Sequence, residues 1–122
     1  MNKKTFDELT LIRGELSEKV NNGVNPFSGY RKFHSCFPHG CCVFAAKCVR
    51  EKLGFSVVRG GFILYRGDRV YDHTWNETPD GEIVDLTADQ FSLDLPYILV
   101  TPKNSDLARE HYLESRTHFN QL

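Results

Sequence analysis

The sequence predicts a single α+β domain in which two N-terminal helices pack on an antiparallel sheet of about five strands. Apolar residues recur at helical spacing in residues 5–20 and again in residues 41–53. From residue 55 onward the pattern changes to alternating or continuous β-formers, separated by Gly, Pro and Asp. A chain of 122 residues has room for one hydrophobic core, so we expect residues 1–122 to form one domain.

The first helix is expected over residues 5–20. Thr5 followed by Glu8 has the spacing of a capping box, and the apolar residues after it keep a helical period. The Asn-Asn-Gly step at residues 21–23 ends this helix. Residues 23–40 contain Gly, Pro, Ser and aromatic residues without a clear period. This composition indicates an ordered loop of the kind that often lines functional sites.

The second helix is expected over residues 41–53, with Gly54 as its C-terminal stop. One of its faces carries only small and apolar side chains, namely Cys42, Ala45, Ala46, Val49 and Leu53. A helix that packs closely on a sheet has such a face. We therefore expect this side of the helix to contact the strands and the charged opposite side to contact solvent.

The rest of the chain predicts strands at residues 55–60, 61–67, 68–75, 82–87 and 96–101. Gly-Gly, Gly-Asp and Pro-Asp-Gly steps between these segments are interpreted as turns. Such short connections favour an antiparallel meander. The charged segment that follows, residues 105–116, predicts a surface helix.

Composition and charge argue against two classes of partner. The 16 acidic and 15 basic side chains leave a net charge of -1, which gives no electrostatic footprint for nucleic acid or for an anionic membrane surface. No apolar run has the length of a signal-peptide core or a membrane span. We therefore expect a cytoplasmic protein, or one secreted by a route independent of a signal peptide.

Four cysteines crowd between residues 36 and 48, whereas a disulfide framework would spread them along the chain. Reduced thiols are therefore expected. Cys36, Cys41 and Cys42 lack the paired C-x₂-C spacing of structural zinc, which disfavours a metal site that they would share with His34 and His39. No metal or other cofactor is predicted.

Cys41 and Cys42 are both candidate nucleophiles because they begin the second helix. A thiol in the first turn meets the N–H groups and the positive end of the helix dipole, which stabilise the reactive thiolate. Cys42 lies on the face directed toward the sheet, whereas Cys41 is rotated from it by about 100°. Cys42 is therefore favoured, and Cys41 is the alternative. Cys36 and Cys48 are interpreted as small buried hydrophobic residues.

His73 and Asp85 are the candidate base and its orienting carboxylate. Alternation in the strand places His73 on the same face as Trp75, whose ring can shield the imidazole from water. Asp85 follows on the next strand, so pairing across the intervening turn brings its carboxylate near His73, where it favours the imidazolium. The alternative is that Asp85 caps the turn at residues 87–89.

An acyl-transfer site also needs hydrogen-bond donors for the oxyanion that forms on the attacked carbonyl. The backbone N–H of the nucleophile can supply one. Candidates for a second donor, or for the substrate pocket, are His34, His39, Trp75 and Gln90. The sequence does not choose among them.

These residues resemble the papain-like and transglutaminase-like superfamily of cysteine enzymes, in which a Cys at a helix start precedes His and Asp on consecutive strands. The resemblance covers residues 40–91 and rests on Gly40-Cys41-Cys42, on His73-Thr74-Trp75 and on residues 83–91. The last segment, IVDLTADQF, is similar to one in small bacterial proteins of this kind.

The resemblance implies that Cys42, His73 and Asp85 are nucleophile, base and orienting residue. Setting Phe44 against the aromatic residue that follows a papain-type nucleophile selects Cys41 instead. The implied activity is that of a cysteine hydrolase or amidase that attacks a peptide or glutamine-type amide through a thioester.

Three activities fit this description: a peptidase, a protein-glutamine deamidase and a transglutaminase. Each would act on a protein or peptide, and small stand-alone domains of such folds resemble effectors or toxins. The chain has no counterpart of the upstream Gln that donates to the oxyanion in papain-type enzymes. The alternative prediction is therefore a non-catalytic protein-binding module on the same fold.

Overall fold

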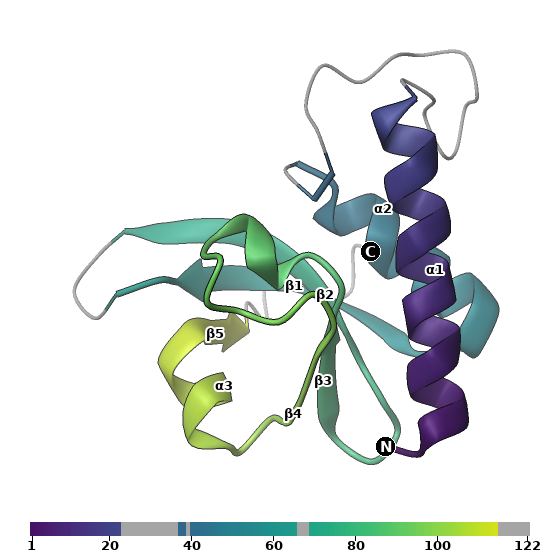
Figure 1. Cartoon of the computed structure of the whole chain (residues 1–122). Coiled ribbons are helices and arrows are strands. Elements are labelled where there is room, and N and C mark those ends of the chain that lie inside the picture. The colour runs from purple at the N-terminus through teal and green to yellow at the C-terminus, as the bar shows by residue number, and fades with distance from the viewer. Residues whose placement is uncertain (23–36, 39, 66–68, 115–122) are drawn as a thin grey trace.

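The computed structural model describes residues 1–22, 37–38, 40–65 and 69–114. Its elements are α1 (Lys3–Asn21), α2 (Cys42–Leu53), β1 (Ser56–Ile63), β2 (Val70–Glu77), β3 (Glu82–Asp85), the 3₁₀ helix η1 (Ala88–Gln90), β4 (Leu99–Pro102), α3 (Asp106–His111) and β5 (Tyr112–Glu114). In this part of the chain, five strands form one curled antiparallel sheet in the order β4-β3-β2-β1-β5 (Figure 1). The predicted α+β class with an antiparallel sheet is confirmed.

The helix α1 forms where the helical period of apolar residues predicts it, and Leu9, Ile12, Leu16 and Val20 are buried. Its start differs from the prediction. The side chain of Asn2, rather than that of Thr5, caps the helix by accepting a hydrogen bond from the Thr5 N–H at 2.8 Å. The predicted capping box at Thr5 is therefore wrong, because an Asn three residues upstream already supplies the acceptor.

The helix α2 begins at Cys42, and Cys41 is its N-cap residue. It ends at Gly54, whose φ of 75° is a left-handed conformation that glycine adopts without strain, so the predicted stop is confirmed. The face expected to contact the sheet is the buried one, with Ala45, Ala46 and Val49 in the interior.

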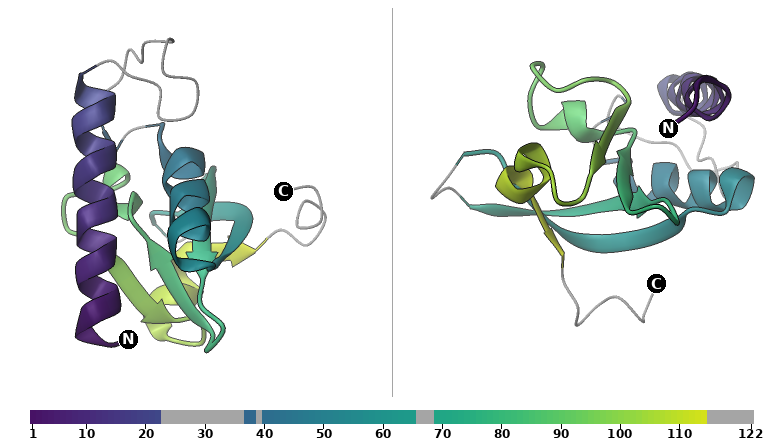
Figure 2. Two further views of the ribbon diagram at one scale, coloured as in Figure 1. Left: turned by 90° about the vertical axis from the view of Figure 1, so that its right-hand side faces the viewer. Right: turned by 90° about the horizontal axis from the view of Figure 1, so that it is seen from below.

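Two contacts fix the position of α2. It lies beside α1 (Figure 2) and packs chiefly on β2. The buried side chain of Asn76 on β2 donates a hydrogen bond from Nδ2 to the Ala46 carbonyl at 2.9 Å. Because both partners are buried, the loss of this bond would leave a polar group without a partner in the interior, which ties the helix to the strand.

The strand β1 is continuous through Gly60 and Gly61, so the prediction of two strands separated by a turn at this pair is wrong. Both glycines pair with residues of β2. A Cβ atom at Gly60 would overlap the Leu113 carbonyl oxygen of β5 and would lie 2.8 Å from the Trp75 ring. Gly60 therefore allows a neighbouring strand and an aromatic ring to approach the backbone closely, and it does not form a turn.

The hairpin of β2 and β3 contains the predicted Pro-Asp-Gly turn, in which Gly81 has a φ of 84°. The two strands pair at Asn76 with Val84 and at Glu77 with Ile83. In the described residues the pairing stops there, although β2 remains paired with β1 over its whole length. Next to this pairing, Cys42 at the start of α2 contacts His73 and Thr74 in the middle of β2.

The helix predicted over residues 105–116 is confirmed for its first part, Asp106–His111, and is wrong for Tyr112–Glu114. The helix α3 ends at His111, and the chain continues as β5, which pairs with β1 at Gly60, Gly61 and Phe62. Residues 115 and 116 lie outside the described residues, as does the predicted Gly-Asp turn at 67–68. The fifth strand of the sheet therefore comes from the C-terminal segment and not from a split of β1.

Hydrophobic residues form two clusters on opposite sides of β3. Val84 packs with residues of α1 and α2, whereas its neighbour Ile83 packs with residues of β1, β2, β4 and α3. Successive side chains of a strand point to opposite faces, which accounts for the division. None of the helices in the described part of the chain has the length and apolar character that crossing a membrane requires.

Candidate active site

His73 and Asp85 meet in the interior of the protein. Nε2 of His73 lies 2.6 Å from Oδ2 of Asp85, and each residue is only 1% exposed. His73 comes from the middle of β2 and Asp85 from the last position of β3, so the hairpin between these strands sets their separation. The two polar residues that the sequence pattern assigned to neighbouring strands are therefore in direct contact.

The carboxylate of Asp85 accepts hydrogen bonds at both of its oxygens. Oδ1 accepts from the backbone N–H of Thr87 at 2.9 Å and from the Thr87 hydroxyl at 3.3 Å. Oδ2 accepts from His73 and from the Tyr112 hydroxyl, each at 2.6 Å. Asp85 thus contacts the imidazole and also stabilises the turn that follows it, so the two roles considered as alternatives are combined in one side chain.

These contacts set the charge of Asp85. Burial alone raises the pKa of a carboxyl group, because it disfavours the anion. The charge of His73 and the hydrogen bonds from His73, Tyr112 and Thr87 outweigh burial and hold the pKa of Asp85 below its usual value. Asp85 is therefore an anion at neutral pH.

His73 is held as the cation. Burial alone lowers the pKa of an imidazole, but the charge of Asp85, its hydrogen bond and the effect of Cys42 raise the pKa of His73 to about 9. Both ring nitrogens then carry a proton at neutral pH, and Nε2–H donates to Asp85. Among the residues that the structure describes, four aromatic rings surround the imidazole at centroid distances of 4.9 to 6.2 Å: Phe62, Trp75, Phe91 and Tyr112.

Cys42 lies at the start of α2 and contacts β2. Burial alone raises the pKa of its thiol, but the interaction with the His73 side chain, the positive charge of that ring and the backbone N–H of Thr74 outweigh burial and lower the pKa. His73 Nδ1 is the nitrogen left for the thiol; it is buried and makes no hydrogen bond of ordinary geometry within the described residues.

The two other cysteines that the structure describes have different surroundings. Cys41 is 1% exposed and packs in the hydrophobic cluster with α1, where burial and the neighbouring Cys42 raise its pKa to about 11. Burial is also the main cause that raises the pKa of Cys48. Because the thiolate is the nucleophile, this arrangement favours Cys42 over both. Cys36 lies outside the described residues.

Gln90 is the predicted oxyanion candidate that lies beside the start of α2. Its Oε1 accepts a long hydrogen bond of 3.5 Å from the Gly40 N–H, which directs Nε2 away from that contact. Nε2 is buried and has no hydrogen-bond partner among the described residues. A buried amide donor without a partner is uncommon in folded proteins and requires an explanation.

The other candidate oxyanion donors or pocket residues are Trp75, His34 and His39. Trp75 is 2% exposed, and its ring packs edge-on against Tyr112 at 4.9 Å, so it belongs to the aromatic surroundings of His73. Its indole nitrogen, like Nε2 of Gln90, has no hydrogen-bond partner in the part of the chain that the structure describes. His34 and His39 lie outside that part.

Sequence reasoning missed Arg13 and Tyr112, which both support the site. The Arg13 guanidinium binds the two carboxylate oxygens of Asp89 at 2.7 and 2.9 Å. It also donates to the carbonyls of Leu86 at 2.6 Å and Tyr97 at 2.9 Å. Arg13 therefore fastens the segment that follows Asp85 to α1. The sequence carries no local signal for this contact, because its partners lie more than seventy residues away.

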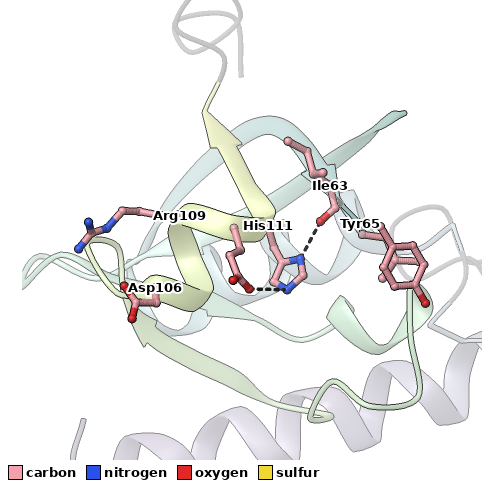
Figure 3. A pocket seen from close by; sticks show the side chains of 7 residues that line it. Ile63, Tyr65, Asp106, Arg109 and His111 are labelled. Atoms are coloured by element: carbon pink, nitrogen blue, oxygen red, sulfur yellow. Dashed lines mark hydrogen bonds and ion pairs between the residues drawn. The ribbon is translucent and has the colours of Figure 1, made fainter. Parts of the chain in front are cut away.

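A separate pocket of about 700 Å³ lies between the end of β1 and α3 (Figure 3). Its lining consists of Ile63, Leu64, Tyr65, Asp106, Arg109, Glu110 and His111. The Phe62 ring is stacked against His111, which lines the pocket, at 5.1 Å, and it packs edge-on against His73 at 5.8 Å. The pocket lining includes none of the predicted site residues.

No family model, no curated protein and no solved structure matches this chain. Within the residues that the structure describes, no group of three or more His, Cys, Asp and Glu side chains is placed to hold a metal ion.

Replacement of Asp85 by Asn tests the electrostatic coupling in this site. The variant keeps the size of the side chain but removes the charge that raises the pKa of His73, so the thiolate of Cys42 becomes less stable. We expect alkylation of Cys42 by iodoacetamide at neutral pH to slow by about tenfold or more, since one pKa unit changes the thiolate population tenfold. Labelling is measured by peptide mass spectrometry, with Cys48 as the internal reference.

The matched control is Asp89→Asn, which removes a second buried carboxylate that is paired with Arg13 instead of His73. This change is expected to lower stability and to leave the reactivity of Cys42 at its parent value. Equal losses of reactivity in the two variants would show that general destabilisation, and not the charge of Asp85, controls the thiol.

Proposed function

We propose that this chain is a cysteine-dependent acyl-transfer enzyme of the papain-like or transglutaminase-like type. Cys42 is the nucleophile, His73 the general base and acid, and Asp85 the residue that orients His73. The observation that carries the proposal is the buried contact of 2.6 Å between His73 and Asp85, on the strand that the start of α2 contacts through Cys42. The order Cys, His, Asp along the chain agrees with the order that the sequence resemblance implies.

The reaction follows from the charges of these groups. The thiolate of Cys42 attacks the carbonyl carbon of an amide, forming a C–S bond and an oxyanion. His73 Nδ1–H then gives its proton to the leaving nitrogen as the C–N bond breaks, which leaves a thioester and a neutral imidazole. His73 next removes a proton from water or from an amine, which attacks the thioester. The products are a carboxylic acid or a new amide, and the thiolate is restored.

Asp85 keeps its negative charge throughout this cycle. Its hydrogen bond at Nε2 holds the ring so that Nδ1 is the nitrogen available to substrate, and its charge stabilises the imidazolium. The aromatic rings around His73 limit the access of water and strengthen this interaction, because charges attract more strongly in a medium of low polarity.

The substrate class is a peptide or glutamine-type amide on a protein or peptide partner. Cys42 is only partly buried, whereas His73 and Asp85 are almost fully buried, so substrate approaches from the side of α2. Peptidase, deamidase and transglutaminase activities share the thioester and differ in the amide attacked and in the group that resolves it. An effector or toxin that modifies another protein is consistent with each of them.

Gln90 supplies the second oxyanion donor in this proposal. The unpartnered Nε2 of Gln90 and the backbone N–H of Cys42 both belong to the region where α2 begins. Two donors directed at a developing oxyanion stabilise the tetrahedral intermediate more than the planar amide. The role of the upstream Gln in papain-type enzymes is thereby given to a residue that follows Asp85.

Replacement of Cys42 by Ala tests the proposed activity. We expect hydrolysis of peptide amides, release of ammonia from glutamine-containing proteins, or incorporation of a labelled amine to fall by at least about 10³-fold, because the Cys42 sulfur forms the thioester in this proposal. The covalent intermediate should be visible by mass spectrometry on the parent protein and absent from the variant.

Cys48→Ala is the matched control, since Cys48 lies on the same helix and is also half-buried. This variant should keep the parent activity. Activity that survives in Cys42→Ala and disappears in Cys41→Ala would move the nucleophile by one residue. A parent protein in which Cys42 is alkylated no faster than Cys48 would contradict the enzyme proposal and favour the binding module.

Gln90→Ala separates oxyanion stabilisation from thiol activation. We expect kcat for acyl transfer to fall by about 10²- to 10³-fold, the usual effect of losing one oxyanion donor. Alkylation of Cys42 by iodoacetamide should keep its parent rate, because displacement of iodide forms no oxyanion. A parallel loss of both rates would show instead that Gln90 acts only by holding the start of α2 in place.

A further inference from the structure

Tyr112 connects the C-terminal strand to the candidate site. It is the first residue of β5 and follows directly after α3. The preceding residue, His111, anchors this junction to β1: its Nδ1 lies 2.6 Å from the Ile63 carbonyl (Figure 3). The His111 ring also stacks on Phe62 at 5.1 Å. Tyr112 is thereby fixed on the far side of β1 with its side chain directed toward β2 and β3.

The hydroxyl of Tyr112 donates a hydrogen bond of 2.6 Å to Oδ2 of Asp85, the oxygen that also accepts from His73. Burial, followed by the charge of Asp85 and this hydrogen bond, raises the pKa of Tyr112 well above its usual value. The hydroxyl therefore stays protonated and acts only as a donor. Hydrogen bonds to a charged acceptor in a buried site are among the strong ones in proteins.

This contact affects both the charge and the position of the carboxylate. Without it, Oδ2 would have His73 as its one remaining donor, and a proton could be shared more evenly between the imidazole and the carboxylate. The Tyr112 ring also packs edge-on against Trp75 at 4.9 Å, which limits the movement of the hydroxyl. Both oxygens of Asp85 are thus occupied before substrate binds.

We propose that Tyr112 is a positioning residue of the acyl-transfer site, and that the docking of β5 on β1 completes the site by keeping Asp85 ionised and oriented toward His73. This inference rests on the proposed function and adds a residue to it. Tyr112 touches neither the thiol nor the reacting carbonyl and acts through Asp85.

The docking of β5 depends on a short contact. The strand has three residues and pairs with β1 at Gly60, Gly61 and Phe62. The absence of a side chain at Gly60 allows the Leu113 backbone to approach. A strand of this length contributes few hydrogen bonds of its own, so the Tyr112 hydroxyl and the His111 contact fasten it to the rest of the sheet.

The experiment is Tyr112→Phe, which removes the hydroxyl and keeps the ring. The rate of Cys42 alkylation by iodoacetamide is measured against pH on the full chain. When Asp85 becomes protonated, His73 loses its partner and the Cys42 thiolate is lost. We therefore expect the acid-side fall in rate to move to higher pH by about one unit, the size of shift that loss of one hydrogen bond to a charged group produces.

The control is Tyr97→Phe, in which the hydroxyl removed belongs to a residue that is 68% exposed. Its profile should coincide with that of the parent. Thermal unfolding followed by circular dichroism is recorded for each variant, because a change in stability alone lowers the amount of folded protein without moving the pH of the transition.

The possible outcomes are separable. An acid-side transition in Tyr112→Phe at the parent pH, with Cys42 still highly reactive in both proteins, overturns the positioning role and leaves the proposed function intact. A parent Cys42 that reacts no faster than Cys48 overturns the proposed function itself. A shift in Tyr112→Phe that is absent from Tyr97→Phe supports the inference.

Discussion

The buried carboxylate of Asp85 is the charge that connects β2, β3 and β5 in the described part of the sheet. Taking an ion of this size out of water is unfavourable by several kcal/mol even after relaxation, so the fold must provide partners for both oxygens. Those partners come from β2 through His73, from the turn after β3 through Thr87, and from β5 through Tyr112. Loss of any one of these elements would leave Asp85 without part of its compensation.

The charge on Asp85 affects the pKa of Cys42 through His73. Burial opposes ionisation at all three groups, and their mutual interactions outweigh it at each one, so that the pKa of Asp85 and of Cys42 is lowered and that of His73 is raised. Cys41, one residue away, lacks this coupling and has a raised pKa. The difference between two adjacent cysteines therefore arises from position relative to β2, since both lie at the positive end of the same helix.

Local sequence patterns predicted much of the fold and of the site. Helical period predicted the two N-terminal helices, strand alternation predicted the antiparallel sheet, and the Pro-Asp-Gly turn between two strands predicted the contact of His73 with Asp85. The errors in the strand assignments have a common cause in long-range contacts. Gly60 and Gly61 resemble a turn, yet they give room to β5. Tyr112 lies in a charged segment with helical character, and its strand conformation depends on pairing with residues about fifty positions earlier. A glycine pair inside an apolar strand was the one available signal of such an approach.

We infer that His73 is an imidazolium at neutral pH, held by Asp85 and paired with the thiolate of Cys42. Titration of the His73 ring nitrogens by NMR in the folded parent protein measures this most directly. We expect both nitrogens to be protonated at pH 7 and the ring to titrate near pH 9. A neutral ring at pH 7, with a transition at or below the ordinary imidazole value of 6.5, would contradict it.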